Sequence, residues 1–237
     1  MFDLHWVVAA IALFVGCAIQ TAIGFGMAVI AAPVIVIFKP EWVPTTLTMV
    51  ALVLSIQNTW NQRSGLAVRL IVPAMISRLP GTVLGAWILL IIPVQMLQTL
   101  VSVMVFVAIF VTLFAKPFAA TRANLSVAGF VSGIAGTTTS IGGPPMALVM
   151  QHGDSHTTRA NLSLYFTFSC ITSLISYQVV GILDRGLWLA GLSFIPVAYL
   201  GFFVGKQLRH WVDDRFRVIL LSLCSLSAFI ALYGAVF

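Results

Sequence analysis

Long apolar runs, separated by short polar stretches, follow one another along the whole chain. A helix needs about 20 mostly apolar residues to cross a bilayer, so runs of this length with few charges are typical of transmembrane spans. Six runs reach about this length, and the pattern predicts an all-α, polytopic membrane protein. The predicted spans are residues 43–62, 66–92, 94–115, 161–181, 187–205 and 216–237.

Two further runs, residues 4–38 and 124–151, contain segments that break a helix. The first break, residues 20–26, combines Gln20 and Thr21 with two glycines. The second, residues 136–145, has four consecutive hydroxyl residues followed by two glycines and two prolines. Proline removes a backbone donor and glycine permits tight backbone geometry. In hydrocarbon such a break is tolerated only where it is buried in protein or lines a watery cavity, so both breaks indicate a site.

The basic residues indicate how the two interrupted runs cross the bilayer, because cytoplasmic loops carry an excess of Lys and Arg. If each interrupted run crosses once, the two sides receive five and six basic residues. If each returns to its own side, the division is nine to two. We therefore predict two re-entrant hairpins, a cytoplasmic side with nine basic residues, and both termini outside. The nine are Arg63, Arg69, Lys116, Arg122, Arg159, Lys206, Arg209, Arg215 and Arg217; the other two are Lys39 and Arg185.

The two halves of the chain resemble each other at an almost constant offset. Each half then contains one hairpin and three spans, an odd number of crossings, so the second half enters from the opposite side. We predict inverted-topology repeats over residues 1–118 and 119–237, a layout that many secondary transporters share, with substrate held near the midplane. The matching pairs are Ile23-Gly24 with Ile141-Gly142, Gly65 and Arg69 with Gly181 and Arg185, and Pro80 and Gly85 with Pro196 and Gly201.

Composition supports the membrane assignment. Of 237 residues, 60% are hydrophobic and only 8% charged, whereas soluble domains carry about 25% charged residues. The net charge of +6 comes from residues at segment ends, so topology explains it and we expect no nucleic-acid partner. The N-terminus has no basic region before its apolar run and is not predicted to be a cleaved signal peptide. The three cysteines, Cys17, Cys170 and Cys224, form no CxxC pair and are expected to be packing residues.

The two breaks together predict an anion-binding site. In a re-entrant hairpin the second limb begins at mid-depth, where its free N–H groups and positive dipole end point into the protein. One such limb is expected to begin at Pro144-Pro145 and the other near Met27. The alternative is a glycine-rich packing contact whose hydroxyls bond their own backbone. The predicted ligands are Gln20, Thr21, Gly24, Gly26, Thr137, Thr138, Thr139, Ser140, Gly142 and Gly143.

Arg78 lies near the centre of the 66–92 span, where a lone charge is costly and usually faces the bundle interior. Because no Asp or Glu lies within a predicted span, an anionic substrate is a candidate partner for Arg78. The alternative is that Arg78 snorkels to the membrane surface.

Polar stripes on two spans predict a pathway, with interhelical hydrogen bonding as the alternative. One stripe comprises Asn58, Asn61 and Gln62, and the other includes Ser169, Thr172, Ser173 and Ser176. His152 and His156 are four residues apart, but no Cys, Glu or third His accompanies them. We therefore predict no metal site, although either histidine could titrate near neutral pH.

The segment from Gly136 to Met146, together with Ile23-Gly24-Phe25-Gly26 and Pro33, resembles the TauE/SafE family of membrane permeases, also called the sulfite exporter family. The resemblance implies transport of sulfur-containing anions such as sulfite, sulfoacetate or other organosulfonates, in most cases across a prokaryotic plasma membrane. We expect a secondary transporter in the bacterial inner membrane, not an enzyme. The expected partners are a small anion, the lipid bilayer and a coupling proton or ion, with no cofactor. The rivals are an anion channel and an intramembrane hydrolase with a Ser140–His152 dyad.

Overall fold

A computed structural model describes residues 3–114, 119–150 and 153–209, and every regular element in these ranges is helical. Four of the described helices are long and apolar enough to cross a membrane: Leu4–Ile23, Val68–Ile91, Ser155–Val179 and Arg185–Arg209. The predicted all-α, polytopic membrane class is therefore confirmed. The predicted span 216–237, Cys224 and His152 lie outside the described residues. The elements are α1 (Leu4–Ile23), α2 (Met27–Phe38), η1 (Pro40–Trp42), α3 (Thr45–Asn61), η2 (Arg63–Gly65), α4 (Val68–Ile91), α5 (Val94–Phe114), α6 (Arg122–Thr139), α7 (Gly143–Met150), α8 (Ser155–Val179) and α9 (Arg185–Ser193).

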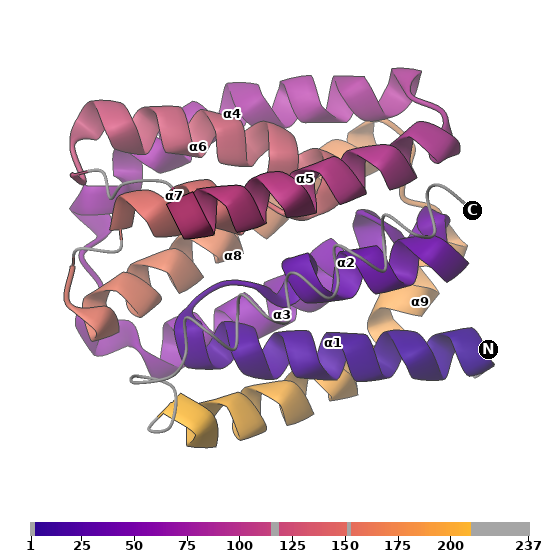
Figure 1. Cartoon of the computed structure of the whole chain (residues 1–237), viewed down its shortest axis with the longest axis horizontal. Coiled ribbons are helices and arrows are strands. Elements are labelled where there is room, and N and C mark those ends of the chain that lie inside the picture. Colours follow the sequence, from indigo (N-terminus) through magenta and orange to yellow (C-terminus); the bar gives the residue numbers. More distant parts are fainter. Residues whose placement is uncertain (1–2, 115–118, 151–152, 210–237) are drawn as a thin grey trace.

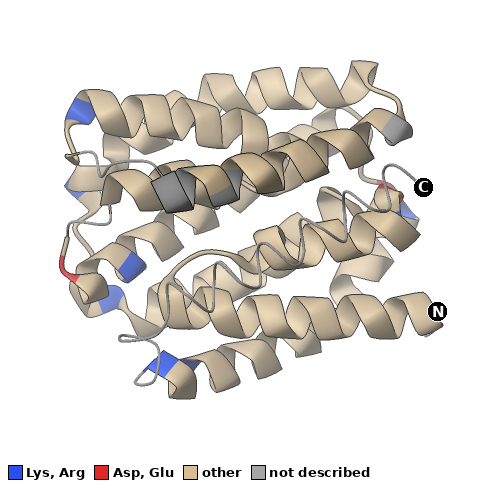
Figure 2. Ribbon diagram, in the orientation of Figure 1, with Lys and Arg blue, Asp and Glu red and all other residues tan. Residues whose placement is uncertain are grey.

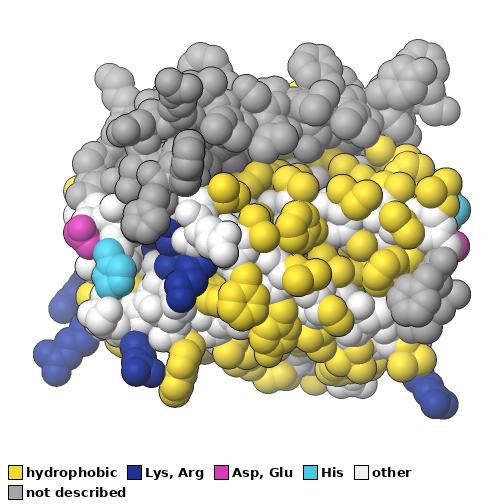
Figure 3. Space-filling model, turned by 90° about the horizontal axis from the view of Figure 1, so that it is seen from below, with side chains coloured by type: hydrophobic (Ala, Val, Ile, Leu, Met, Phe, Trp, Pro, Cys, Tyr) yellow, Lys and Arg dark blue, Asp and Glu magenta, His cyan; other side chains and the backbone are white. Residues whose placement is uncertain are grey.

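After a turn at Phe194, helical structure resumes and continues to Arg209. We call the whole stretch, Arg185–Arg209, the α9 segment. The helices run roughly along the long axis of the molecule (Figure 1). Exposed apolar side chains cover the middle of the face seen in Figure 3, whereas charged side chains lie toward the two ends of that axis. This distribution fits a protein whose long axis crosses a bilayer.

Both interrupted runs fold as helical hairpins. α1 and α2 form the first hairpin, which turns at Gly24–Gly26, and α6 and α7 form the second, which turns at Ser140–Gly142. Figure 1 shows the first hairpin opening toward the end that holds the N-terminus and the second opening toward the opposite end. That opposite end, which we call the basic end, carries most of the Lys and Arg residues in Figure 2. An inverted-repeat relation between the halves stays a prediction.

The second hairpin differs in detail from the sequence expectation. The sequence placed the break at residues 136–145, but α6 has 18 residues and continues to Thr139. At 1.5 Å per residue it is about 27 Å long, close to the thickness of the hydrocarbon core. The hydroxyls of Thr138 and Thr139 donate to the carbonyls of Ile134 and Ala135 in the same helix. These side chains therefore bond within α6, and the helix continues through them.

Glycine faces bring the spanning helices against the hairpins. Gly81 of α4 lies so close to the carbonyl of Phe130 in α6 that a side chain there would collide with it. Gly205 of the α9 segment lies equally close to the carbonyl of Ala18 in α1. These contacts match the small-residue packing common between membrane helices. They set the depth at which each hairpin turn is held.

Candidate functional site

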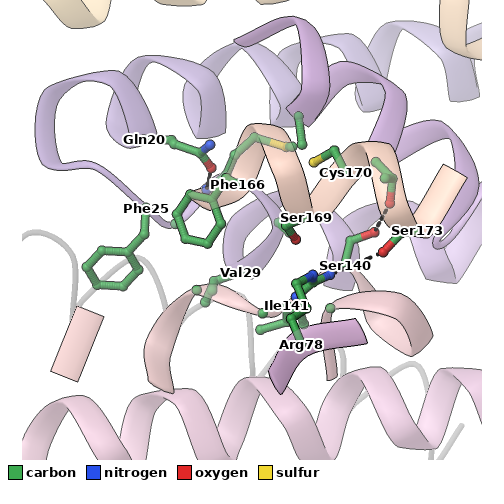
Figure 4. Close-up of a pocket in the computed structure, with 18 residues that line it drawn as sticks. Gln20, Phe25, Val29, Arg78, Ser140, Ile141, Phe166, Ser169, Cys170 and Ser173 are labelled. Carbon is green, nitrogen blue, oxygen red and sulfur yellow. Dashed lines mark hydrogen bonds between the residues drawn. The ribbon is translucent and has the colours of Figure 1, made fainter. Parts of the chain in front are cut away.

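The turns of both hairpins meet at a small cavity of about 40 Å³. α4, α3 and α8 complete its wall, so segments from both halves of the chain enclose it (Figure 4). A cavity of this size has room for roughly three water molecules. Its lining comprises Gln20, Phe25, Gly26, Met27, Ala28, Val29, Thr48, Ala51, Arg78, Gly136, Ser140, Ile141, Gly142, Gly143, Phe166, Ser169, Cys170 and Ser173.

The first hairpin contributes the start of α2. Gly24 and Gly26 have φ angles of 111° and 116°, in the left-handed region that glycine adopts without strain. These angles let α1 end and α2 begin within three residues. The side-chain Oε1 of Gln20 accepts a hydrogen bond of 3.2 Å from the backbone N–H of Met27, which satisfies one free donor at the start of α2. Ala28 and Val29, the next residues of this first turn, line the cavity together with Gly26 and Met27.

The second hairpin turns through Ser140, which has a left-handed φ of 63° and caps α6. Its Oγ donates a 2.9 Å hydrogen bond to the carbonyl of Pro44 and lies 3.1 Å from the Oγ1 of Thr48. These contacts fasten the turn to α3. α7 begins directly afterwards at Gly143, with Pro144 in its first turn, as the sequence predicted.

Arg78 is the charged residue of this site. The side chain is 1% exposed, so it does not snorkel to the membrane surface. Its Nη1 donates to the carbonyl of Ser132 at 2.8 Å and to the Oγ of Ser132 at 3.2 Å, and its Nη2 donates to the Oγ of Ser173 at 3.1 Å. The Tyr165 ring lies 5.7 Å from the guanidinium carbon. All of these groups are neutral, and Nε has no hydrogen-bond partner among the described residues.

No carboxylate lies in the lining of the cavity, so the described residues leave the charge of Arg78 uncompensated. The two ion pairs recorded in the described ranges, His5–Asp3 and Lys39–Glu41, involve partly exposed side chains near the chain's N-terminal end. A buried charge without an ionic partner is costly in a low-dielectric interior. The cavity is therefore electropositive and suited to an anion.

Ser132 connects Arg78 to the second hairpin, and the sequence analysis did not single it out. Its Oγ accepts from Arg78 and donates a 2.6 Å hydrogen bond to the carbonyl of Gly142. A chain of hydrogen bonds thus runs from the guanidinium to the hairpin turn, and such chains strengthen their members cooperatively. The small residues on this face of α6 were the available signal: Ser132 lies one turn before Gly136, which contacts the guanidinium.

The structure brings some of the predicted ligands to the cavity and places others away from it. Eight of the predicted residues line the cavity: Gln20, Gly26, Arg78, Ser140, Gly142 and Gly143 from the expected ligands, and Ser169 and Ser173 from the expected pathway. Thr137 bonds to Ser173 at 3.0 Å, one step behind the lining. Thr138 and Thr139 bond within their own helix, which is the arrangement that the packing alternative describes.

Thr21 and Gly24 lie behind the first turn, on the side away from the cavity. Asn58 bonds to Thr21 at 3.1 Å, and Gln62 is buried at the C-terminal cap of α3. Asn61 and Ser176 are half-buried. Sequence reasoning missed Thr48, Gly136, Phe25 and Phe166 as lining residues, and it assigned Cys170, which also lines the cavity, to packing alone.

The fold and the site together define a class: an all-helical membrane protein with a buried, electropositive cavity where two helix breaks meet. The model of the family described as sulfite exporter TauE/SafE matches residues 8–230, nearly the whole chain. The chain belongs to this family, which confirms the resemblance of its motifs. The family implies a membrane transporter of sulfite or related anions, and its members are transporters rather than enzymes. Comparisons with curated proteins and with solved structures found no match.

Proposed function

We propose that this chain is a secondary transporter that moves a small sulfur-containing oxyanion, such as sulfite, sulfoacetate or another organosulfonate. The observation that carries the proposal is Arg78, a buried guanidinium with no carboxylate partner among the described residues, at the cavity where both hairpins turn. Family membership supports the anion class. We further propose that the basic end faces the cytoplasm of a bacterial cell, because basic residues concentrate there (Figure 2).

The donors around the cavity support an oxyanion as the substrate. The Nε of Arg78, which has no hydrogen-bond partner in the described part of the chain, gives one charge-assisted donor, and such hydrogen bonds are about twice as strong as neutral ones. The first turn of α2 at Met27 and that of α7 at Gly143 add backbone N–H groups and the positive ends of two helix dipoles. The small volume favours an ion with few heavy atoms in this conformation, and a longer organosulfonate would require a wider state of the same site.

The arrangement of the hairpins supports alternating access. The second turn is fastened by the Ser140 bond to Pro44 and by the Tyr177 hydroxyl, which donates a 2.6 Å hydrogen bond to the carbonyl of Thr137. The first turn is fastened separately, by Asn58 and Arg209. Because different residues hold the two turns, each hairpin can move without the other and open the cavity toward one end. Coupling would come from a protonated substrate or another ion.

Two measurements test this function. A thermal-shift screen of purified protein against sulfite, organosulfonates, sulfate and carboxylates identifies the anion, because a ligand that binds the folded state raises its stability. A sulfur oxyanion should give the largest shift, and stabilisation by carboxylates alone would refute the substrate class. Counterflow in proteoliposomes separates a carrier from the channel alternative. Trans-stimulation of anion uptake is expected, and its absence with rapid uptake would favour a channel.

A further inference from the structure

A second polar cluster lies at the basic end, behind the turn of the first hairpin. Arg209, the last residue of the α9 segment, donates from Nε to the carbonyl of Thr21 and from Nη2 to the Oδ1 of Asn58, both at 3.1 Å. The Nδ2 of Asn58 in turn donates to the Oγ1 of Thr21 at 3.1 Å. These bonds fix the plane of the guanidinium. No described residue bonds to its third nitrogen, Nη1.

A second arginine packs against the same hairpin turn. The side chain of Arg159, in the first turns of α8, packs against Gly24, with its Cγ 3.3 Å from the place where a Cβ would stand. The charge of Arg159 acts unfavourably on that of Arg209. Two like charges repel each other, and the attraction of a bound anion to both would offset that repulsion.

Gln62 provides an independent observation. It caps the C-terminal end of α3, where its backbone N–H donates to the carbonyl of Asn58 at 3.0 Å, so Gln62 lies next to the residue that bonds Arg209. The side chain is only 2% exposed, yet neither Nε2 nor Oε1 has a hydrogen-bond partner among the described residues. Buried amides without partners are rare and often mark an absent water or ion.

The turn of the first hairpin separates this cluster from the cavity. Gln20 lines the cavity, whereas the next residue, Thr21, bonds to Arg209. Gly24 faces Arg159, whereas Gly26, two residues later, lines the cavity. An anion at the cluster would therefore be one hairpin turn away from Arg78.

We propose that Arg209, Arg159 and Gln62 form a second subsite for the transported oxyanion, on the basic side of the first hairpin turn. This inference rests on the proposed function for the identity of the ion. The planar guanidinium groups match oxyanion geometry, and the Gln62 amide supplies a neutral donor. The subsite is more exposed than the cavity, so it binds more weakly and its binding falls as ionic strength rises. It would concentrate the anion next to the element that moves.

Calorimetric titration of the full chain in lipid nanodiscs with sulfite tests the subsite. The wild-type protein should bind two sulfite ions, one more weakly than the other. R78Q should lose the tighter binding and keep the weaker. R209Q should weaken the second binding about tenfold, the loss of roughly one charge-assisted hydrogen bond. The control R122Q removes an exposed charge at the same end, at the start of α6, and should leave both bindings unchanged.

Saturation of the wild-type protein by one sulfite ion would overturn the subsite, whatever the variants do. An equal loss in R122Q and R209Q would also overturn it, because a diffuse surface charge would then explain the weak binding. R159Q tests the same subsite from α8 and serves if R209Q fails to fold. Weak sulfite binding that is unchanged in folded R159Q contradicts the proposal. If R78Q instead binds both ions like the wild type, the proposed function fails and the subsite stands.

Discussion

Replacing Arg78 with glutamine removes the only charge among the described residues that line the cavity, while it keeps a neutral hydrogen-bond donor. In the native protein the guanidinium bonds to Ser132 and Ser173, and its Nε is left without a described partner. A glutamine amide can bond to one of these serines. The glutamine side chain supplies neither the positive charge nor the third donor. The variant therefore tests what the charged guanidinium contributes to binding the anion.

The expected loss of affinity follows from two estimates. A unit charge about 4 Å from the anion contributes about 4 kcal/mol at an effective dielectric constant of 20. Mutational data assign about 1.5–3 kcal/mol to a hydrogen bond with a charged partner. The loss should then lie at about 2–4 kcal/mol, and the dissociation constant for sulfite should rise about 30- to 1000-fold.

The assay is sulfite binding by calorimetry, with thermal unfolding of the unliganded protein measured beside it. R78Q should unfold no earlier than the wild type, because a buried charge without an ionic partner adds little stability. The matched control is R63Q, since the exposed Arg63 stacks over Trp60 at 4.8 Å, away from the cavity, and should bind sulfite normally. If folded R78Q binds sulfite within about threefold of the wild type, Arg78 does not hold the anion and the reasoning is refuted.

Three other variants test neighbouring features. In Gly136→Ala the new Cβ would lie 3.1 Å from Nη2 of Arg78 and displace the guanidinium. Sulfite binding should therefore weaken about tenfold, with little change in unfolding temperature. Normal sulfite binding in this variant would mean that the position of the guanidinium does not matter. Gly205→Leu places a side chain against the Ala18 carbonyl and should lower the unfolding temperature by several degrees, whereas unchanged stability would show that the α9 segment does not need this approach. The pKa of Asp154 is lowered because its carboxylate accepts the backbone N–H of Thr157 at the start of α8. Its stabilisation is therefore present above the ordinary Asp pKa and is lost as pH falls through the lower, folded-state value. Asp154→Asn keeps the cap without a titrating group, so its unfolding temperature should fall less on acidification, and identical acid profiles would contradict this.

Local sequence patterns were reliable where local chemistry decides structure. Residues 43–62 contain helix α3 at Thr45–Asn61, and residues 66–92 contain α4 at Val68–Ile91, which is long and apolar enough to cross a membrane; the span boundaries themselves stay predictions. The hydroxyl-rich stretch was harder. Thr138 and Thr139 can bond either to a ligand or to their own helix, and composition does not distinguish the two. In the structure they bond within α6, and only Ser140 of the four consecutive hydroxyl residues reaches the cavity lining.

The sequence by itself determined the membrane class, the two helix breaks, the concentration of basic residues and the presence of one charge inside a span. Each is set by hydropathy, backbone geometry or charge within a single segment, and so can be read locally. Only the tertiary structure decided which groups meet. Arg78 reaches Ser132, 54 residues away, because glycine faces let α4 approach α6 closely. It reaches Ser173, 95 residues away, because α8 forms another wall of the same cavity. Such long-range approach depends on the packing of whole helices, which no single segment specifies.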